Sequence, residues 1–195
     1  MSGCLLILSF EGDPGLTGAE EELALAECLG LGLKDMGPEP AAAWFAHRHS
    51  VSFKLSPLLT DGFFVDTFEV AAPWADLVPL YEGVRAGLGD EVALMAHFSH
   101  AYAEGCSIYF SMAGKGSDEA STLALYDRAW GRALELAHHL GATQSHHHGV
   151  GILKQHGMAR EHGAFMRGLR AFKKAVDPGW IANPGKLGLK EDASP

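Results

Sequence analysis

The chain has 195 residues, 47% hydrophobic and 20% charged, a composition typical of a soluble globular protein with one full core. Its formal net charge is −9 and it has no block of basic residues, so a nucleic-acid-binding surface is disfavoured. No apolar run is long enough to span a membrane. The three cysteines have no metal-binding spacing, which favours free, buried thiols and a cytoplasmic location. We expect one domain over residues 1–195.

The N-terminal part of the chain predicts a strand, a helix and a loop. The apolar run over residues 4–10 predicts a strand, because it is short and ends in a turn signal. A helix is expected over residues 17–33, with Thr17 as its N-cap. Prolines interrupt residues 36–43, and this segment is predicted to be a loop.

The remainder of the chain predicts an α+β fold. Strand-like and helical patterns follow in the order 63–70 (strand), 74–88 (helix), 92–102 and 106–113 (strands), 123–137 and 165–176 (helices). The second and third strands meet at Ala103-Glu104-Gly105, which indicates a hairpin. An antiparallel sheet covered by helices is therefore favoured over a doubly wound parallel sheet. Residues 187–195 are expected to form a flexible tail.

The most distinctive stretch is Ser145-His146-His147-His148-Gly149-Val150-Gly151. In a strand the middle imidazole would point away from its neighbours, whereas in a loop all three can converge. Each ring can donate, accept or carry a proton near neutral pH. The glycines permit positive φ and let a flat ligand approach the backbone. The pattern alone leaves open a functional site, an exposed polar loop or a metal-binding tract.

The order of motifs resembles that of one family. The motifs are Cys106-Ser107-Ile108-Tyr109-Phe110, Tyr126-Asp127-Arg128 within a helix, the histidine stretch, Asp177-Pro178 and Asn183-Pro184-Gly185-Lys186. This order resembles the C-terminal, substrate-capping part of FAD-linked oxidases of the vanillyl-alcohol oxidase class. Within that class it most resembles the alkyldihydroxyacetonephosphate synthase branch, which Asp66-Thr67-Phe68-Glu69 and Ala72-Pro73-Trp74 also match.

The resemblance implies a ferredoxin-like cap domain that contacts FAD. In the family an N-terminal domain holds most of the FAD, and this chain contains no phosphate-cradling glycine motif of its own. We therefore expect the chain to need a FAD-binding domain or partner chain for activity. A homodimer is a further expectation.

In the synthase branch, an acyl chain on dihydroxyacetone phosphate is exchanged for a fatty alcohol, with the substrate held on the flavin. The resemblance implies Tyr109, His146, His147 and His148 as catalytic residues, and the three histidines, Gly149 and Asn183 as FAD contacts. A tyrosine ordinarily has a pKa of about 10, so a tyrosine base at neutral pH needs adjacent positive charge or hydrogen bonds. The histidines would supply them.

Substrate binding is expected to involve Lys54, assisted by Arg48. The synthases carry an arginine in the segment that aligns with Phe53-Lys54-Leu55-Ser56, and here the only cation is Lys54. Lysine provides a point charge where arginine provides a bidentate fork. The expected ligand is an anionic, lipid-like substrate.

Two alternatives remain at this stage. One is a D-2-hydroxyacid dehydrogenase of the same class, whose members tend to bind a divalent metal through histidines. The matching residues here include His97 and His100, which lie three apart in a predicted strand and should point to opposite faces, so no metal site is expected. The other is a non-catalytic domain or subunit that caps a separate FAD-binding chain.

Overall fold

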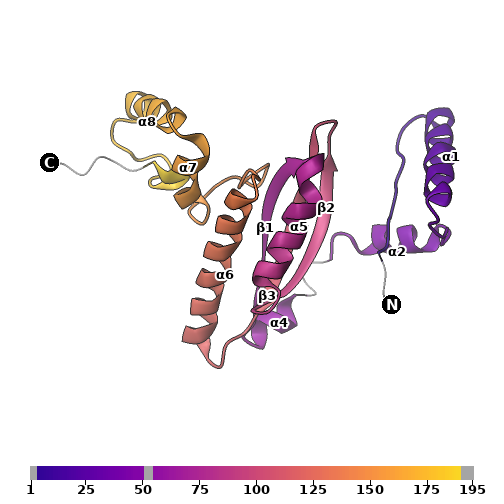
Figure 1. Cartoon of the computed structure of the whole chain (residues 1–195), viewed down its shortest axis with the longest axis horizontal. Helices are drawn as coiled ribbons and strands as arrows, with labels where there is room; N and C mark the ends of the chain where they lie inside the picture. The colour runs from indigo at the N-terminus through magenta and orange to yellow at the C-terminus, as the bar shows by residue number, and fades with distance from the viewer. Residues whose placement is uncertain (1–3, 51–54, 190–195) are drawn as a thin grey trace. The chain divides into compact units, whose positions relative to one another are not determined.

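The computed structural model describes residues 4–50 and 55–189. The chain divides into two compact units, Met1–Ser56 and Pro57–Pro195. Helices α1 (Pro14–Gly30) and α2 (Glu39–His47) belong to the first unit. The elements that follow are α4 (Ser56–Thr60), β1 (Phe64–Pro73), α5 (Trp74–Leu88), β2 (Ala93–Ala101), β3 (Gly105–Gly114), α6 (Glu119–His139), η1 (Gln155–Gly157), α7 (Met158–His162), α8 (Phe165–Val176) and η2 (Lys186–Gly188) (Figure 1).

Three expectations for the first unit are wrong. Residues 4–10 form no strand, because the described residues offer this apolar run no neighbouring strand with which to pair. Helix α1 starts earlier than expected, since Asp13 rather than Thr17 caps it by accepting the N–H of Gly15 at 2.9 Å. The predicted loop over residues 36–43 contains the start of α2, whose Pro40 lies in the first turn, where its missing N–H costs nothing.

The cysteines also depart from the expectation of buried thiols. Cys106 is buried, but Cys28 is only half-buried and Cys4 is exposed. None of the described helices is long and apolar enough to cross a membrane.

The sheet confirms the predicted antiparallel α+β fold. Its three strands lie in the order β1-β3-β2, and both pairs are antiparallel. With α5 between β1 and β2, and α6 after β3, this is a ferredoxin-like arrangement. In the described residues, the place of a fourth strand is taken by a single bridge between Ala71 and Thr143 at the outer edge of β1. The chain that leaves this bridge leads directly into the histidine stretch.

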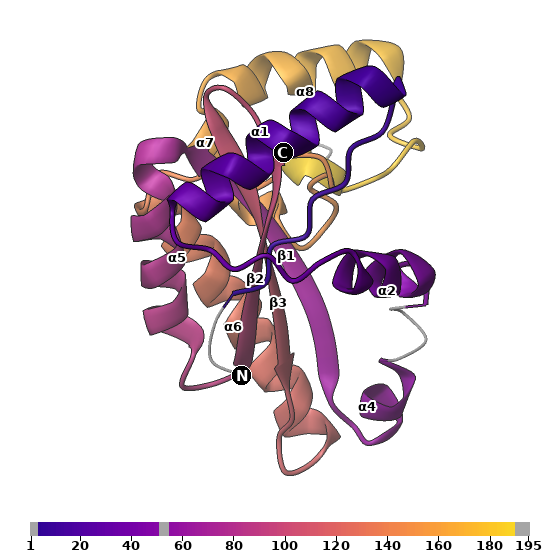
Figure 2. The same ribbon diagram turned by 90° about the vertical axis from the view of Figure 1, so that its right-hand side faces the viewer.

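Helices α5 and α6 cover one face of the sheet (Figures 1 and 2). Alternate residues of the strands point into this core and are buried: Phe68, Val70 and Ala72 in β1, and Cys106, Ile108, Phe110 and Met112 in β3. Trp130 of α6 is buried in the same core. The strand residues between them face the other way, and the candidate site forms on that opposite face.

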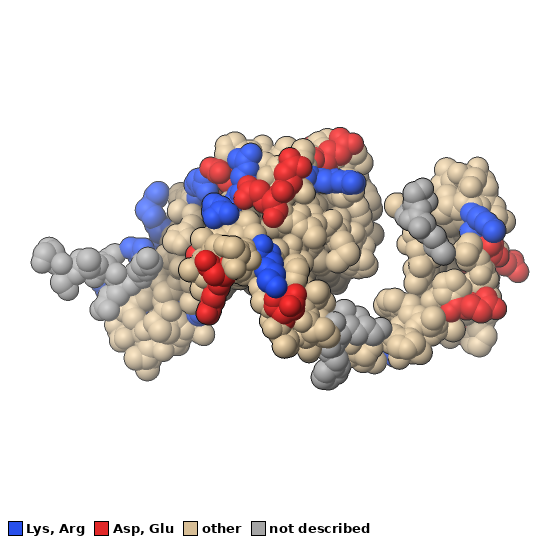
Figure 3. Space-filling model, turned by 90° about the horizontal axis from the view of Figure 1, so that it is seen from below, with Lys and Arg blue, Asp and Glu red and all other residues tan. Residues whose placement is uncertain are grey.

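The charges of the second unit are of both signs on the face shown in Figure 3, where Lys and Arg lie among Asp and Glu. Lys115 Nζ lies 3.3 Å from Asp61, and Arg128 Nε lies 3.8 Å from Glu91. Because all four side chains are well exposed, each pair contributes little to stability.

The start of β3 requires glycine. A Cβ at Gly105 would lie 2.2 Å from the carbonyl oxygen of Ala72 and 2.9 Å from Cα of Pro73, both backbone atoms. We expect Gly105→Ala to lower the free energy of unfolding by about 1–3 kcal/mol in urea denaturation. The control Gly131→Ala lies on the exposed side of α6, where its Cβ would meet no atom within 4 Å in the part of the chain that the structure describes, and should instead raise the free energy of unfolding by about 0.5–1 kcal/mol. Equal effects would contradict the close approach of β3 to β1.

Candidate functional site

A row of side chains crosses the face of the sheet that α5 and α6 leave uncovered. Glu69 of β1 pairs with Tyr109 of β3, and Tyr109 pairs with His97 of β2. Paired residues of neighbouring strands point to the same face, so these three side chains form a line. The ring centroids of His97 and Tyr109 lie 5.7 Å apart. The histidine stretch is built on this row.

The three consecutive histidines lie in an irregular loop, which lets their rings converge. The ring centroid of His147 lies 5.2 Å from that of His146 and 4.5 Å from that of His148. The ring of His148 in turn lies 5.0 Å from that of Tyr109. Gly149, which follows, has a φ of 78°, a conformation that glycine adopts without strain. The loop therefore brings together the four residues expected to be catalytic.

The loop is organised around the carboxylate of Glu69, which is fully buried. Glu69 Oε2 accepts the backbone N–H groups of His146 at 3.2 Å, His147 at 3.1 Å and His148 at 3.2 Å. Glu69 Oε1 accepts from His146 Nδ1 at 3.0 Å and lies 2.6 Å from His147 Nδ1. Sequence reasoning noted Glu69 only as part of a matching tetrapeptide. The sequence contains one further indication of a special role for Glu69, which is that an acidic residue stands beside apolar ones in a predicted strand.

The contacts of Glu69 decide its ionisation. Burial alone would raise the pKa of this carboxyl group, but the backbone amides of His148, His146 and His147, together with the His146 ring, outweigh that effect. They lower the pKa of Glu69 to about 2, so its side chain is an ionised acceptor at neutral pH.

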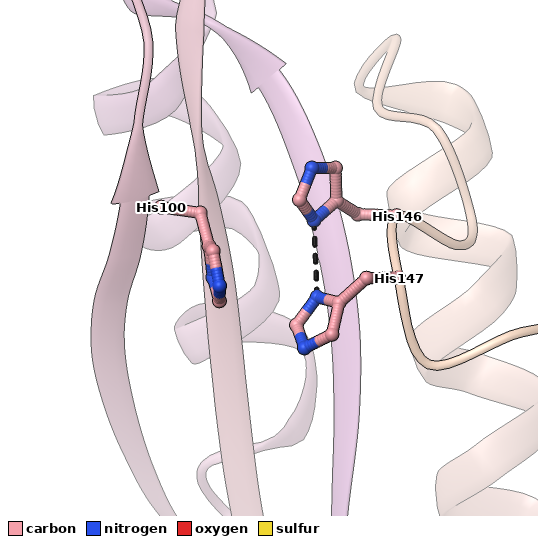
Figure 4. Close-up of side chains that lie close together, drawn as sticks. All are labelled: His100, His146 and His147. Atoms are coloured by element: carbon pink, nitrogen blue, oxygen red, sulfur yellow. Dashed lines mark hydrogen bonds between the residues drawn. The ribbon is translucent and has the colours of Figure 1, made fainter.

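An ionised Glu69 also decides which ring nitrogens carry protons. A nitrogen lone pair facing a carboxylate oxygen at 2.6 Å would be repelled, so we assign protons to Nδ1 of both His146 and His147. The two Nδ1 atoms lie 3.1 Å apart, which is the contact dashed in Figure 4. With a proton on each, neither Nδ1 can accept from the other, so each directs its proton to the shared Glu69 carboxylate. In the neutral rings both Nε2 atoms are therefore acceptors.

Tyr109 lies at the exposed side of this arrangement. Its Oη lies 2.9 Å from His147 Nε2 and 3.2 Å from His100 Nδ1. Because His147 Nε2 is an acceptor, the Tyr109 hydroxyl donates to it, and the Nδ1–H of His100 donates to the tyrosine oxygen. Donation thus runs from His100 to Tyr109, on to His147, and finally to Glu69. Such a hydroxyl can pass its proton to His147 while accepting another.

His100 reaches Tyr109 because β2 is irregular at this point. The register shifts between Ser99 and Ala101, which leaves His100 as an extra residue with a φ of 39°. The expectation that His97 and His100 point to opposite faces is therefore wrong, since the bulge interrupts the alternation. Both rings lie beside that of Tyr109, with centroids 5.7 and 6.0 Å away. Figure 4 shows His100 facing the two loop histidines.

Some of these side chains are close enough together to hold a metal ion. The sets are His100, His146 and His147, and Glu69, His147 and His148, each with ligand atoms within 4.8 Å of one another. The Nδ1 atoms of His146 and His147 already direct protons to Glu69. A metal bound through either Nδ1 would have to displace that proton.

Two further charged residues tie the ends of the loop to the rest of the domain. Before the histidines, the Glu161 carboxylate of α7 accepts the hydroxyl of Thr143 and the backbone N–H of Gln144. After them, Lys154 Nζ donates to the main-chain carbonyl of Glu69 at 2.9 Å. Burial lowers the pKa of Lys154, while the charges of Glu69 and Glu161 act in the opposite direction. The sequence contains no periodic signal that Lys154 is buried or that Glu161 is half-buried.

Of the remaining expected site residues, Arg48 and Asn183 have local contacts, and Lys54 lies outside the described residues. Arg48 follows α2, with its guanidinium 4.6 Å from the ring centroid of Phe45 and a hydrogen bond to the carbonyl of the same residue. Asn183 has a φ of 48° and its carbonyl accepts the N–H of Lys186 at 3.4 Å, a contact within the C-terminal segment.

Comparison with known proteins places this site in a family context. The model of FAD linked oxidases, C-terminal domain, matches residues 1–187. The chain is 27% identical over 191 residues to an alkyldihydroxyacetonephosphate synthase of Trypanosoma brucei brucei, and 29% over 197 residues to one of Dictyostelium discoideum. Each alignment covers 94% of this chain and 31% of the relative. The chain thus spans about a third of the length of these curated relatives.

More distant similarity extends to bacteria and to a solved structure. The chain is 26% identical over 200 residues to an uncharacterized FAD-linked oxidoreductase, YgcU, of Escherichia coli (strain K12), covering 94% of this chain and 41% of that protein. A solved structure of an alkyldihydroxyacetonephosphate synthase superposes with a TM-score of 0.48 at 21% identity. That superposition covers 73% of this chain and 23% of the other.

The lowered pKa of Glu69 predicts that stability depends on pH. Its ordinary pKa is 4.5, so its contribution is fully present above that pH and is lost as the pH falls towards 2. We expect Glu69→Gln to lower the free energy of unfolding by about 2–3 kcal/mol at pH 6, and by progressively less between pH 5 and pH 2. Urea denaturation at each pH measures this difference. The exposed control Glu82→Gln should change it by less than about 0.5 kcal/mol throughout. A constant effect of Glu69→Gln would contradict the assignment.

Proposed function

The chain belongs to the FAD-linked oxidases, whose C-terminal domain it matches, and we propose that it handles the substrate of an enzyme resembling alkyldihydroxyacetonephosphate synthase. Such an enzyme exchanges the acyl chain of a dihydroxyacetone phosphate ester for a fatty alcohol. One observation carries the proposal: Tyr109 Oη lies 2.9 Å from an imidazole nitrogen of His147, whose other nitrogen faces an ionised carboxylate. That arrangement suits proton transfer at a carbon next to a carbonyl group.

The loop is suited to a flat flavin ring. The side chains of His147 and His148 are 42% and 38% exposed. No atom of the described residues lies within 4 Å of the position that a Cβ would take at Gly149 or Gly151, so a planar ring can approach the backbone. When bound, FAD would supply an electron-accepting ring, held mainly by a FAD-binding domain or chain. The proposed contacts from this chain are His146, His147, His148, Gly149 and Asn183.

The proposed proton transfer uses groups that already touch. A proton leaves the substrate carbon for Tyr109 Oη while the hydroxyl proton of Tyr109 passes to His147 Nε2. The resulting imidazolium lies against the Glu69 carboxylate, which stabilises the charge. The Nδ1–H of His100 holds the tyrosine oxygen in place. Glu69 is thus a positioning residue, because it acts through His147.

The phosphate of the substrate needs a cation. Lys54, with Arg48, is the proposed anchor, as the resemblance implies. A lysine there would bind the phosphate as a point charge without the geometric selectivity of an arginine fork.

The proposal is tested by Tyr109→Phe in the chain supplied with a FAD-binding domain or chain of the family. Exchange of labelled hexadecanol into palmitoyl-dihydroxyacetone phosphate is measured. We expect kcat to fall by about 10²–10⁴-fold with KM nearly unchanged, because only the proton-transferring atom is removed. The control Tyr81→Phe, in α5 on the other side of the sheet, should leave both constants unchanged. Retention of full kcat by Tyr109→Phe would refute the proposal.

A second candidate function is a metal-dependent D-2-hydroxyacid dehydrogenase. The bulge at His100 favours it, because this residue joins His146 and His147 in one possible ligand set. Against it, the Nδ1 protons of the two loop histidines are directed to Glu69, so a metal would compete with the contacts that hold the loop.

This candidate is tested by metal content. The purified chain is exposed to Zn²⁺, dialysed and analysed by elemental mass spectrometry. We expect well under one Zn²⁺ per chain, and expect His100→Ala to leave that content unchanged. If the native chain binds one Zn²⁺ and the His100→Ala variant binds none, the dehydrogenase hypothesis is favoured.

A further inference from the structure

Glu69 supports a second tyrosine that neither the sequence motifs nor the proposed mechanism uses. Tyr102 Oη lies 3.1 Å from His146 Nε2, and His146 Nδ1 donates to Glu69 Oε1 at 3.0 Å. With the proton of His146 on Nδ1, its Nε2 is an acceptor and the Tyr102 hydroxyl donates to it. The same order of groups, tyrosine to histidine to Glu69, therefore occurs twice, once through His147 and once through His146.

Tyr102 is held firmly although half of it is exposed. It lies in the turn between β2 and β3, where its N–H donates to the carbonyl of Gly105 at 2.8 Å. Its own carbonyl accepts the indole N–H of Trp74 at 2.9 Å. Both backbone groups are thus engaged, while its side chain remains 51% exposed. The side chain is therefore fixed at His146 while half of the residue stays open to a ligand.

Tyr102 and His146 both line an open pocket of about 360 Å³. The apolar part of the pocket wall is formed by Ala71, Ala72, Pro73 and Cys106. Glu104 also borders the pocket, and a carboxylate there disfavours an anionic ligand. The lining therefore suits a neutral molecule with an apolar tail and a hydroxyl group that reaches the tyrosine.

We infer that Tyr102 and His146 form a second proton-transferring pair, which activates an alcohol bound in this pocket. The inference rests on the proposed function, in which a fatty alcohol replaces an acyl chain. It assigns the entering alcohol to a site distinct from Tyr109 and gives Tyr102 a role at the reacting hydroxyl.

The proton balance of this step is simple. The alcohol gives its O–H proton to Tyr102 Oη, and the hydroxyl proton of Tyr102 passes to His146 Nε2. The electron pair left on the alcohol oxygen forms the new C–O bond. The acyl group leaves the same carbon as a carboxylate and takes the electron pair of the broken C–O bond. The imidazolium of His146 is stabilised by Glu69, as in the other pair.

The pair is tested first without any ligand, by long-range ¹H–¹⁵N NMR of the imidazoles in the ¹⁵N-labelled chain. We expect His146 and His147 to be protonated at Nδ1 when neutral. Tyr102→Phe should shift the Nε2 signal of His146 and leave that of His147 in place, and Tyr109→Phe should do the reverse. The unshifted histidine in each variant reports that the loop has kept its fold. If Tyr102→Phe leaves the His146 signal unchanged, or His146 is protonated at Nε2, the inference is overturned.

The ligand is tested by titrating 1-hexanol while the His146 ring signals are followed. We expect a saturable shift, and about 3- to 10-fold weaker binding to Tyr102→Phe, the range expected for loss of one neutral hydrogen bond. The matched control Tyr81→Phe should bind 1-hexanol as the native chain does, and hexanoate should bind more weakly. No saturable shift, equal affinity of Tyr102→Phe, or tighter binding of hexanoate would each overturn the inference.

These measurements need no flavin, so they are separate from the test of the proposed function. Binding of 1-hexanol through Tyr102 without any exchange activity would reject the proposed function and with it the activation step, while the alcohol site would stand. Exchange activity that survives Tyr102→Phe with the same kcat, and the same KM for the alcohol, would reject the pair and leave the role of Tyr109 intact.

Discussion

Burial of one carboxylate is the constraint on which the site depends. Removing an ionised carboxylate from water costs several kcal/mol unless other groups replace its hydration. At Glu69 the replacements are three successive backbone N–H groups and two imidazoles, all from His146, His147 and His148. If the loop moved away, the Glu69 carboxylate would lose its hydrogen-bond donors while still buried. The loop and the ionised carboxylate therefore depend on each other. The interaction that shapes the loop therefore also decides which ring nitrogen of His146 and of His147 carries the proton.

The two proton-transferring pairs have the same arrangement, because both histidines contact the Glu69 carboxylate. Tyr109 contacts His147, Tyr102 contacts His146, and both Nδ1 atoms meet at one oxygen of Glu69. A single carboxylate balances one imidazolium at a time, so the two pairs suit successive proton transfers. Such a sequence matches an exchange reaction, in which one proton leaves a carbon and another leaves an entering alcohol.

Much of the fold of the second unit could be predicted from local pattern. Strand-like runs predicted the three strands, and the turn at Ala103-Glu104-Gly105 correctly predicted that β2 and β3 form an antiparallel hairpin. Pattern failed where pairing decides the outcome: residues 4–10 have the composition of a strand but have no described partner. It also failed at His100, because a bulge arises from the register between two strands and leaves no periodic trace.

The sequence by itself determined the α+β class, the family and four of the residues that meet at the site, Tyr109, His146, His147 and His148, since a tyrosine in a strand and three histidines before two glycines are local features. Only the tertiary structure decided what those residues do to one another. Glu69 and Lys154 are 85 positions apart, and Tyr102 and His146 are 44 apart. No periodicity connects positions so distant, because their contacts depend on how β1, the hairpin and the loop pack. That packing made a strand glutamate the centre of the site and brought a turn tyrosine into it.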